Sequence, residues 1–222
     1  MAGLCYAAFM ERRASARKYM KTLMTATGNV HHAPHKTPLG YRIESPLGNI
    51  VVCAEHDALT GVFFTGQKHF PALSIADASG AEASQEPYVI SQAREELDAF
   101  FAGELRVFTV PYQAIAGTPF QRQVWQELAR IPYGERVSYG DIARRLNLPV
   151  GAARAIGSAN GRNPISIIVP CHRVIASSGA LTGYAGGLDR KDALLRLETR
   201  QMQLMGRLPG NFVQSEQFSL QL

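Results

Sequence analysis

The sequence is poor in cysteine, in charge and in long apolar runs, and each shortage excludes a class of protein. Its 222 residues hold 3 cysteines, Cys5, Cys53 and Cys171, with no CxxC pair among them. This number and spacing exclude a disulfide scaffold and favour a reducing compartment. No apolar run approaches the roughly 18 to 20 residues of a membrane-spanning helix, which excludes an integral membrane protein. With 18% charged residues and a mean hydropathy of -0.08, the composition is globular rather than disordered.

The net charge of +5 is unevenly distributed along the chain. Residues 1–36 carry a net +5, residues 37–115 a net −6 and residues 116–222 a net +6. A polyanionic partner would therefore meet the C-terminal half, although an ordinary solvated surface explains the same charges.

The basic segment 1–36 is expected to be a dispensable, disordered extension. Its charge follows its apolar stretch instead of preceding it, which argues against a secretory signal. A mitochondrial presequence and an over-long start, with Met20 or Met24 as the initiator, are the alternatives.

Residues 37–115 are expected to form a small α/β domain. Three β-rich runs separated by turn residues predict an antiparallel meander: 41–44, 50–54 and 59–64. Residues 71–87 are rich in Ala and Ser and are expected to be a loop. An apolar stripe then predicts a helix, and it consists of Val89, Ala93, Leu97, Phe100 and Phe101. Residues 107–111 could add an edge strand.

Residues 116–205 are expected to form a mostly helical second domain, with a tail at 206–222. Thr118 can cap a helix that Pro119 begins, and Gln121 completes a capping box. The turn at 131–134 ends this helix.

A helix-turn-helix pattern follows. Ser138 and Asp141 predict the start of one short helix, Leu148-Pro149 breaks it, and a second helix is expected over about 150–159. Two short helices joined by a tight turn are typical of DNA-binding proteins. The second helix is rich in small residues, which let its backbone approach a partner closely, and Arg154 is its only charged residue.

Cys171 is the candidate nucleophile. The apolar run 165–169 should be buried, and Pro170 ends it and presents Cys171. A buried cysteine is usually just a small hydrophobic residue. His172 and Arg173, however, bring positive charge that favours the nucleophilic thiolate. From the residues alone, a reactive and an inert cysteine are about equally good interpretations.

These segments resemble the O6-alkylguanine-DNA alkyltransferases over about residues 37–200, most closely the bacterial Ogt-like branch and the C-terminal half of Ada-type proteins. The motifs that carry the resemblance are Pro170-Cys171-His172-Arg173-Val174, Asn163-Pro164, Gly183-Tyr184-Ala185-Gly186-Gly187, Gly117-Thr118-Pro119-Phe120-Gln121, Ile131-Pro132-Tyr133-Gly134 and Ala152-Ala153-Arg154-Ala155. The resemblance implies an α/β (α+β) fold. A small antiparallel-sheet, ribonuclease H-like N-terminal domain would precede a mostly helical, winged helix-turn-helix-like C-terminal domain.

The resemblance also implies direct-reversal DNA repair. In this family a cysteine takes the alkyl group from O6 of guanine, or from O4-alkylthymine, once and irreversibly. Cys171 matches the acceptor, and His172 matches the base that deprotonates it through a bridging water. Glu198, on an expected helix over 188–198, matches the acid that orients the histidine, and Asn163 matches the residue that braces the preceding turn. Without the resemblance, Glu198 would be interpreted as a solvated charge and Asn163 as a turn residue.

The family flips its substrate base out of the duplex from the minor groove. Arg154 matches the arginine that fills the vacated place in the stack, and Tyr139 matches the tyrosine that pushes the 3′ phosphate. The small residues that would let the helix enter the groove are Ala152, Ala153 and Gly157.

Further matches line the expected base pocket. The hydroxyl of Tyr184 would stabilise the departing guanine, and Ser166 would form part of the wall. The backbone at Cys171 and Val174 would accept the exocyclic amine, and the amide of Ala185 would face O6.

No cofactor is expected. Three scattered cysteines cannot supply the four-cysteine zinc module of Ada-type proteins, and a second possible set shows no trustworthy ligand spacing: Cys5, Cys53, His31, His32 and His56. The expected partner is double-stranded DNA containing alkylated guanine, with no membrane, and the protein is expected to be a monomer that can bind DNA cooperatively. The expected location is the cytoplasm, at the bacterial nucleoid, or the nucleus in a eukaryote.

Two other functions stay open at this point. One is a helix-turn-helix regulator with an inert cysteine. The other is a cysteine hydrolase that uses Cys171 and His172. If these neighbours lie on a strand, their side chains point to opposite faces and do not easily form a direct pair, which argues against a hydrolase.

Overall fold

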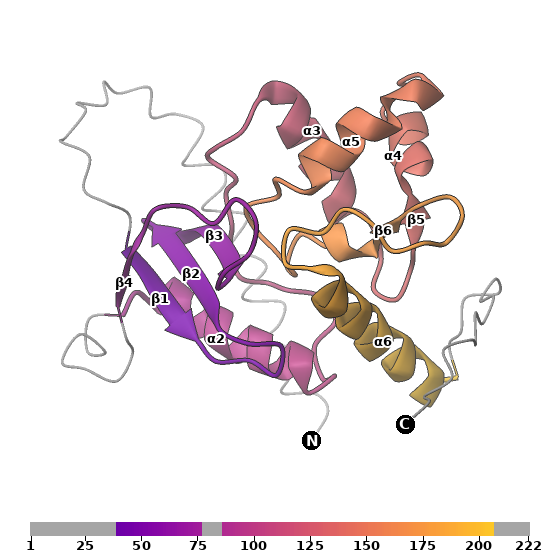
Figure 1. Ribbon diagram of the computed structural model, residues 1–222. Coiled ribbons are helices and arrows are strands. Elements are labelled where there is room, and N and C mark those ends of the chain that lie inside the picture. The colour runs from indigo at the N-terminus through magenta and orange to yellow at the C-terminus, as the bar shows by residue number, and fades with distance from the viewer. Residues whose placement is uncertain (1–38, 77–85, 207–222) are drawn as a thin grey trace, which may run out of the picture. The chain divides into compact units, whose positions relative to one another are not determined.

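The N-terminal part of the fold is a four-stranded sheet. The computed structural model describes residues 39–76 and 86–206 (Figure 1). The strands β1 (Leu39–Ile43), β2 (Ile50–Glu55) and β3 (Ala58–Phe64) form the expected antiparallel meander. A further strand, β4 (Ser74–Ala76), pairs in parallel with β1, so the order is β3-β2-β1-β4. The expectation of a loop throughout 71–87 was therefore wrong at β4, which is three residues long and too short to show an alternating pattern.

Helix α2 (Tyr88–Phe101) packs against β2 and β3 (Figure 1). Its buried residues follow the apolar stripe that predicted it: Val89, Ile90, Ala93, Leu97 and Phe100. No strand forms over 107–111, contrary to the sequence-based expectation. The carboxylate of Glu96 accepts the amides of Thr109 and Val110 at 2.8 and 3.1 Å, which removes them from any strand ladder.

The helices of the C-terminal part begin where the capping residues predicted. Helix α3 (Pro119–Ala129) has a complete capping box between Thr118 and Gln121, and α4 (Tyr139–Arg145) has one between Ser138 and Asp141. After a short turn, η2 (Val150–Ala152) leads into α5 (Ala153–Asn160), which packs against α3 and α4. The helix expected over about 150–159 thus starts with a 3-10 turn.

A short parallel pair frames the segment that contains the candidate nucleophile. Strand β5 (Val137–Ser138) pairs with β6 (Val174–Ile175). In the chain, β6 directly follows the 3-10 turn η3 (Cys171–Arg173). The supposition that Cys171 and His172 lie on a strand was therefore wrong. The last described helix, α6 (Leu188–Leu204), extends beyond the expected 188–198.

The edge of β3 holds the segment that leads to Cys171. The amide of Val62 donates to Pro164 O at 2.8 Å, and the amide of Ser166 donates to Val62 O at 3.0 Å. As expected, residues 165–169 are all buried. The sheet thus anchors this buried loop and supplies hydrogen-bond partners for its backbone N–H and C=O groups.

The mixed α/β fold agrees with the fold expected from the sequence. Within 39–76 and 86–206, no helix combines the length and the apolar character needed to cross a bilayer. The expectations for residues 1–36 lie outside the described part of the chain.

Candidate active site

Cys171 is the first residue of η3 and is only 3% exposed. Its sulfur accepts a hydrogen bond from Asn163 Nδ2 at 3.1 Å. Burial raises the pKa of the Cys171 thiol, while the bond from Asn163 and the charge of Lys191 act in the opposite direction. A thiolate at this position therefore depends on a few specific partners.

Asn163 braces the loop that precedes Cys171 in the sequence. Its Nδ2 also donates to Val169 O at 2.8 Å, and its Oδ1 accepts the amide of Ile165 at 3.1 Å. Between these points Ile167 has a φ of 71°, an uncommon value for a β-branched residue. Such backbone strain persists only where the surroundings enforce it. The side chain of Asn163 therefore connects a strained turn to the sulfur of Cys171.

His172 and Glu198 form a buried pair. His172 Nε2 lies 2.9 Å from Glu198 Oε1, and the two side chains are 0% and 1% exposed. The Glu198 carboxylate also accepts hydrogen bonds from Arg173 Nε and Nη2. It accepts another from the backbone amide of Gly134 at 3.0 Å. The structure thus brings together the histidine and the acid that the resemblance matched, 26 residues apart.

The charges of this cluster suit a neutral histidine beside an ionised acid. Burial raises the pKa of Glu198, but the bonds and charges of His172 and Arg173 outweigh it and lower the pKa to about 2. Burial lowers the pKa of His172 below its usual value, with Glu198 opposing. His172 Nδ1 is buried and has no hydrogen-bond partner among the described residues. A neutral imidazole with one nitrogen held by a carboxylate can take up a proton at the other.

Arg173 does not act as the sequence suggested. It was expected to add positive charge near the thiol, but its guanidinium is engaged by Glu198 and by Ile131 O at 2.6 Å. The cation that affects the thiol is Lys191, which the sequence reasoning missed. A signal existed, because the inward face of α6 repeats at helical spacing: Lys191, Leu194, Leu195 and Glu198.

Lys191 is a fully buried lysine. Its Nζ donates to Val174 O and to Thr182 O, both at 2.5 Å, and lies 6.0 Å from the centre of the Tyr139 ring. Burial lowers the pKa of Lys191 to about 8, against the charge of Cys171, which raises it. The ammonium therefore joins the two backbone segments that follow Cys171.

The expected pocket residues lie in the segments around Cys171. Ser166 is buried, the carbonyl of Val174 is occupied by Lys191, and Ala185 O accepts the amide of Lys68 at 3.0 Å. Burial raises the pKa of Tyr184 well above its usual value, and the charge of Cys171 adds to the effect. The Tyr184 hydroxyl is buried without a hydrogen-bond partner of standard geometry among the described residues.

Helix α5 and the η2 turn before it carry the residues expected to contact DNA from this helix. Arg154 is exposed and forms no hydrogen bond or ion pair with any residue that the structure describes, and Ala152, Ala153 and Gly157 are half-buried. Tyr139 lies beside this helix, since a Cβ on Gly157 would be 3.7 Å from its ring.

The hydroxyl of Tyr139 donates to Thr182 O at 2.9 Å. A Cβ on Gly183, whose φ is 63°, would lie 2.6 Å from that hydroxyl. Only glycine therefore allows this close approach of the loop to Tyr139.

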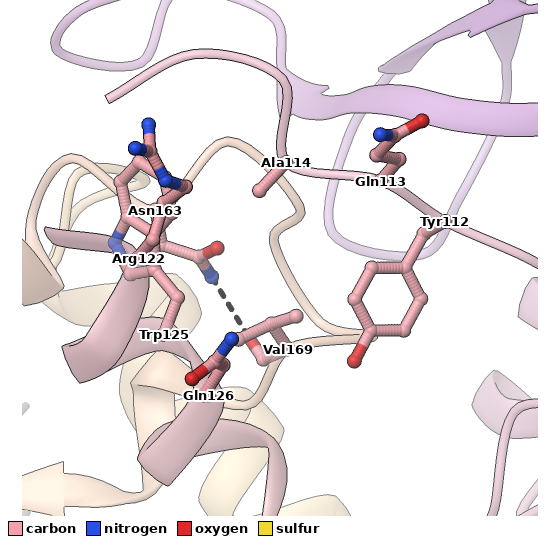
Figure 2. Close-up of a pocket in the computed structure, with 8 residues that line it drawn as sticks. All are labelled: Tyr112, Gln113, Ala114, Arg122, Trp125, Gln126, Asn163 and Val169. Carbon is pink, nitrogen blue, oxygen red and sulfur yellow. Dashed lines mark hydrogen bonds between the residues drawn. The ribbon is translucent and has the colours of Figure 1, made fainter. Parts of the chain in front are cut away.

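A groove opens beside Asn163, with a volume of about 330 Å³ (Figure 2). Its walls come from α3 and from the segment that follows α2, and Figure 2 shows the bond from Asn163 to Val169 at one wall. The lining residues are Tyr112, Gln113, Ala114, Arg122, Trp125, Gln126, Asn163 and Val169. Asn163 thus lines this groove and also donates a hydrogen bond to the sulfur of Cys171.

Residues 39–76 and 86–206 contain no group of three or more His, Cys, Asp or Glu side chains that could hold a metal ion. Cys53 is a buried core residue, and burial raises its pKa to about 11. The other possible ligands considered, Cys5, His31 and His32, lie outside the described part of the chain.

A buried cysteine beside a histidine and a carboxylate, next to a helix-turn-helix, defines a class of protein: one that performs cysteine chemistry at DNA. Two family models match the chain. The ribonuclease-like domain of 6-O-methylguanine DNA methyltransferase matches residues 39–114, and its DNA binding domain matches residues 119–200. The chain belongs to the 6-O-methylguanine DNA methyltransferase family.

Individual relatives agree with the family assignment. A methylated-DNA--protein-cysteine methyltransferase of Mycolicibacterium paratuberculosis is 47% identical over 158 residues, which is 71% of this chain and 90% of the relative. The crystal structure of the Mycobacterium tuberculosis O6-methylguanine methyltransferase has a TM-score of 0.62 at 43% identity and covers 78% of this chain and 95% of its own. The Mycobacterium tuberculosis OGT in complex with DNA has a TM-score of 0.64 at 44% identity, covering 73% and 94%.

Proposed function

We propose that this protein repairs alkylated DNA by moving an alkyl group from O6 of guanine to the sulfur of Cys171. The observation that carries the proposal is the buried cluster of Cys171, His172 and Glu198, with His172 Nδ1 free of any partner among the described residues. Relatives named methylated-DNA--protein-cysteine methyltransferase support the reaction. A relative solved in complex with DNA supports the choice of partner.

The chemistry is one displacement. The thiol of Cys171 gives its proton to His172 through a bridging water, and Glu198 stabilises the imidazolium. The sulfur then bonds to the alkyl carbon as the carbon–O6 bond breaks, and the electron pair remains on guanine. Guanine regains a proton from the Tyr184 hydroxyl, which His172 reprotonates through solvent. The thioether has no leaving group, so the protein acts once.

We further propose that the base is flipped out of the duplex before transfer. Helix α5 would enter the minor groove, with Arg154 in the vacated place and Tyr139 against the 3′ phosphate. The exposure of Arg154, without any bond to another described residue, supports this role. The same pocket would accept O4-alkylthymine, which carries its alkyl group on a similarly placed oxygen.

The working protein is a monomer that can bind DNA cooperatively, and it acts where chromosomal DNA lies, at the bacterial nucleoid or in a nucleus. The proposed division is an extension at 1–36, an α/β domain at 37–115, a DNA-binding and active-site domain at 116–205 and a tail at 206–222. The alternation of net charge along the chain supports this division, since residues 116–222 carry +6.

The proposal is tested with a duplex that contains one O6-methylguanine bearing a radiolabelled methyl group. The label should move to the protein, and the base should return to guanine. Cys171→Ser should bind the duplex and transfer nothing. A regulator would bind DNA and leave the label there, and a hydrolase would turn over an ester or a peptide; either result would overturn the proposal.

A further inference from the structure

Asn160, the last residue of α5, lies against the backbone of the reactive segment and is 1% exposed. Its Nδ2 donates to Cys171 O at 3.3 Å and to Gly183 O at 3.2 Å. Cys171 carries the reactive sulfur, and Gly183 directly precedes Tyr184. One side chain on the helix that presents Arg154 therefore binds both segments of the expected base pocket.

The orientation of this side chain is fixed. An amide nitrogen donates and an amide oxygen accepts, so two carbonyls at one end identify that end as Nδ2. The backbone around Asn160 is also held, because Trp125 Nε1 donates to Ala159 O at 2.9 Å and the amide of Asn163 donates to Asn160 O at 3.2 Å. The amide is therefore preorganised before any base arrives.

The oxygen of the same amide has no donor. Asn160 Oδ1 is buried and lacks a hydrogen-bond partner among the residues that the structure describes. The histidine Nδ1 and the Tyr184 hydroxyl share that condition, but the proposed reaction already gives each of them a proton to take up or to donate, whereas the amide oxygen has no such role. Leaving a buried acceptor unpaired is costly, so a ligand that supplies a donor here gains by pairing with it.

The alkylated base has one such donor. Alkylation at O6 removes the hydrogen from N1, so the exocyclic amine is the only donor group left on the pairing edge of guanine. Each backbone acceptor expected for that amine already holds one donor and has one lone pair left: Cys171 O accepts from Asn160, and Val174 O accepts from Lys191 Nζ at 2.5 Å. The free Oδ1 belongs to the amide that binds Cys171 O.

We propose that Asn160 determines specificity for guanine, its Oδ1 accepting a hydrogen bond from the exocyclic amine of the flipped base. This inference rests on the proposed function. It gives Asn160 two tasks: Nδ2 holds the pocket segments, and Oδ1 reads the amine. A base of the same shape without the amine leaves Oδ1 unpaired and reacts more slowly.

The test compares two duplexes, one with O6-methylguanine and one with O6-methylhypoxanthine, which lacks only the exocyclic amine. Single-turnover rates at saturating protein give a guanine preference for each variant. Wild type should prefer guanine, and Asn160→Leu, similar in size, should lose a roughly two- to tenfold part of that preference, the usual range for one neutral hydrogen bond. Because the preference is a ratio within one variant, any general loss from the missing Nδ2 bonds cancels. Ser158→Ala, an exposed change on the same helix, should keep the wild-type ratio.

Asn160→Ala is measured in parallel, in case leucine disturbs folding. If neither variant transfers, the same ratio is taken from binding of the two duplexes in a Cys171→Ser background, which needs no chemistry. An unchanged preference in folded variants would overturn the role of Asn160 while leaving the proposed function intact. Failure of wild type to transfer from either duplex would instead overturn the proposed function.

Discussion

Asn163 donates a hydrogen bond to the sulfur of Cys171 from the same amide nitrogen that holds Val169 O, 2.8 Å away. The residue that shapes the turn is thus also a partner of the proposed nucleophile. Because a hydrogen bond to sulfur stabilises the charged form, Asn163 and Lys191 oppose the burial that raises the pKa of the thiol.

Replacing Asn163 should therefore affect reactivity and stability together. In Asn163→Ala, the pH at which iodoacetamide modifies Cys171 at half its maximal rate should rise, because the thiolate loses a donor. The free energy of unfolding should fall by about 1–3 kcal/mol, since Val169 O and the Ile165 amide lose a buried partner. The measurements are a pH series of modification rates and urea unfolding. A lower stability with an unchanged pH profile would show that Asn163 is structural only.

Loss of His172 or Glu198 should slow transfer without abolishing DNA binding. General-base catalysis contributes about 10² to 10⁴ in rate, and the two losses should be non-additive because Glu198 acts through His172. Single-turnover rates of His172→Gln, Glu198→Gln and the double variant test this. A double loss equal to the product of the single losses would contradict the relay.

The same carboxylate gives a prediction for acid stability. The pKa of Glu198 is about 2 in the fold, below its value of about 4.3 in an unfolded chain. Its contribution is therefore present in full above the unfolded value and is lost as pH falls toward 2. Urea midpoints between pH 7 and pH 3 should fall less steeply for Glu198→Gln than for wild type. Parallel curves would contradict the assignment.

Lys191→Met should raise the pH at which Cys171 reacts with iodoacetamide, because the thiolate loses a buried cation. The substitution should also change how the free energy of unfolding depends on pH above about pH 8. Between the folded pKa of about 8 and the unfolded value near 10.4, the unfolded chain binds more protons, so Lys191 makes stability rise with pH. The variant should lack that rise in urea unfolding at pH 8 to 10. Lys191→Arg is the control that keeps a cation.

Local sequence signals predicted much of this fold, and tertiary partners account for what they missed. The capping boxes at Thr118 and Ser138 work within four residues, so they could be read directly. Strand β4 depends on β1, 35 residues earlier at Leu39 opposite Ser74, and no local pattern encodes that pairing. The absent strand at 107–111 likewise depends on Glu96, in the preceding helix.

The candidate site divides in the same way. Family motifs pointed to Cys171, His172 and Glu198, and the structure brings the histidine and the acid into contact. Asn160 and Lys191 were missed because each is defined by the carbonyls it reaches, in segments that only the fold brings close. Arg173 was placed near the thiol by sequence adjacency, but it turns to Glu198 because a buried carboxylate needs a cation.

Arg154→Ala separates base flipping from chemistry. Extrusion costs a few kcal/mol of pairing and stacking, and an inserted side chain offsets part of it, while a free alkylguanine needs no extrusion. The variant should be slower on saturated duplex, less affected on single-stranded DNA and unaffected on free O6-benzylguanine, provided the pocket beside Ser166 admits the benzyl group. Equal rates for wild type and variant on saturated duplex would leave Arg154 as a phosphate contact.

The protein itself is proposed to be the final acceptor of the alkyl group, and a titration followed by intact-mass measurement decides whether it is. With excess duplex containing O6-methylguanine, transfer should stop at one equivalent per protein. The mass should rise by one methylene, on the peptide that contains Cys171, because a thioether has no route back to thiolate. Continued transfer beyond one equivalent, or an unmodified Cys171 peptide after the DNA has been repaired, would contradict the account.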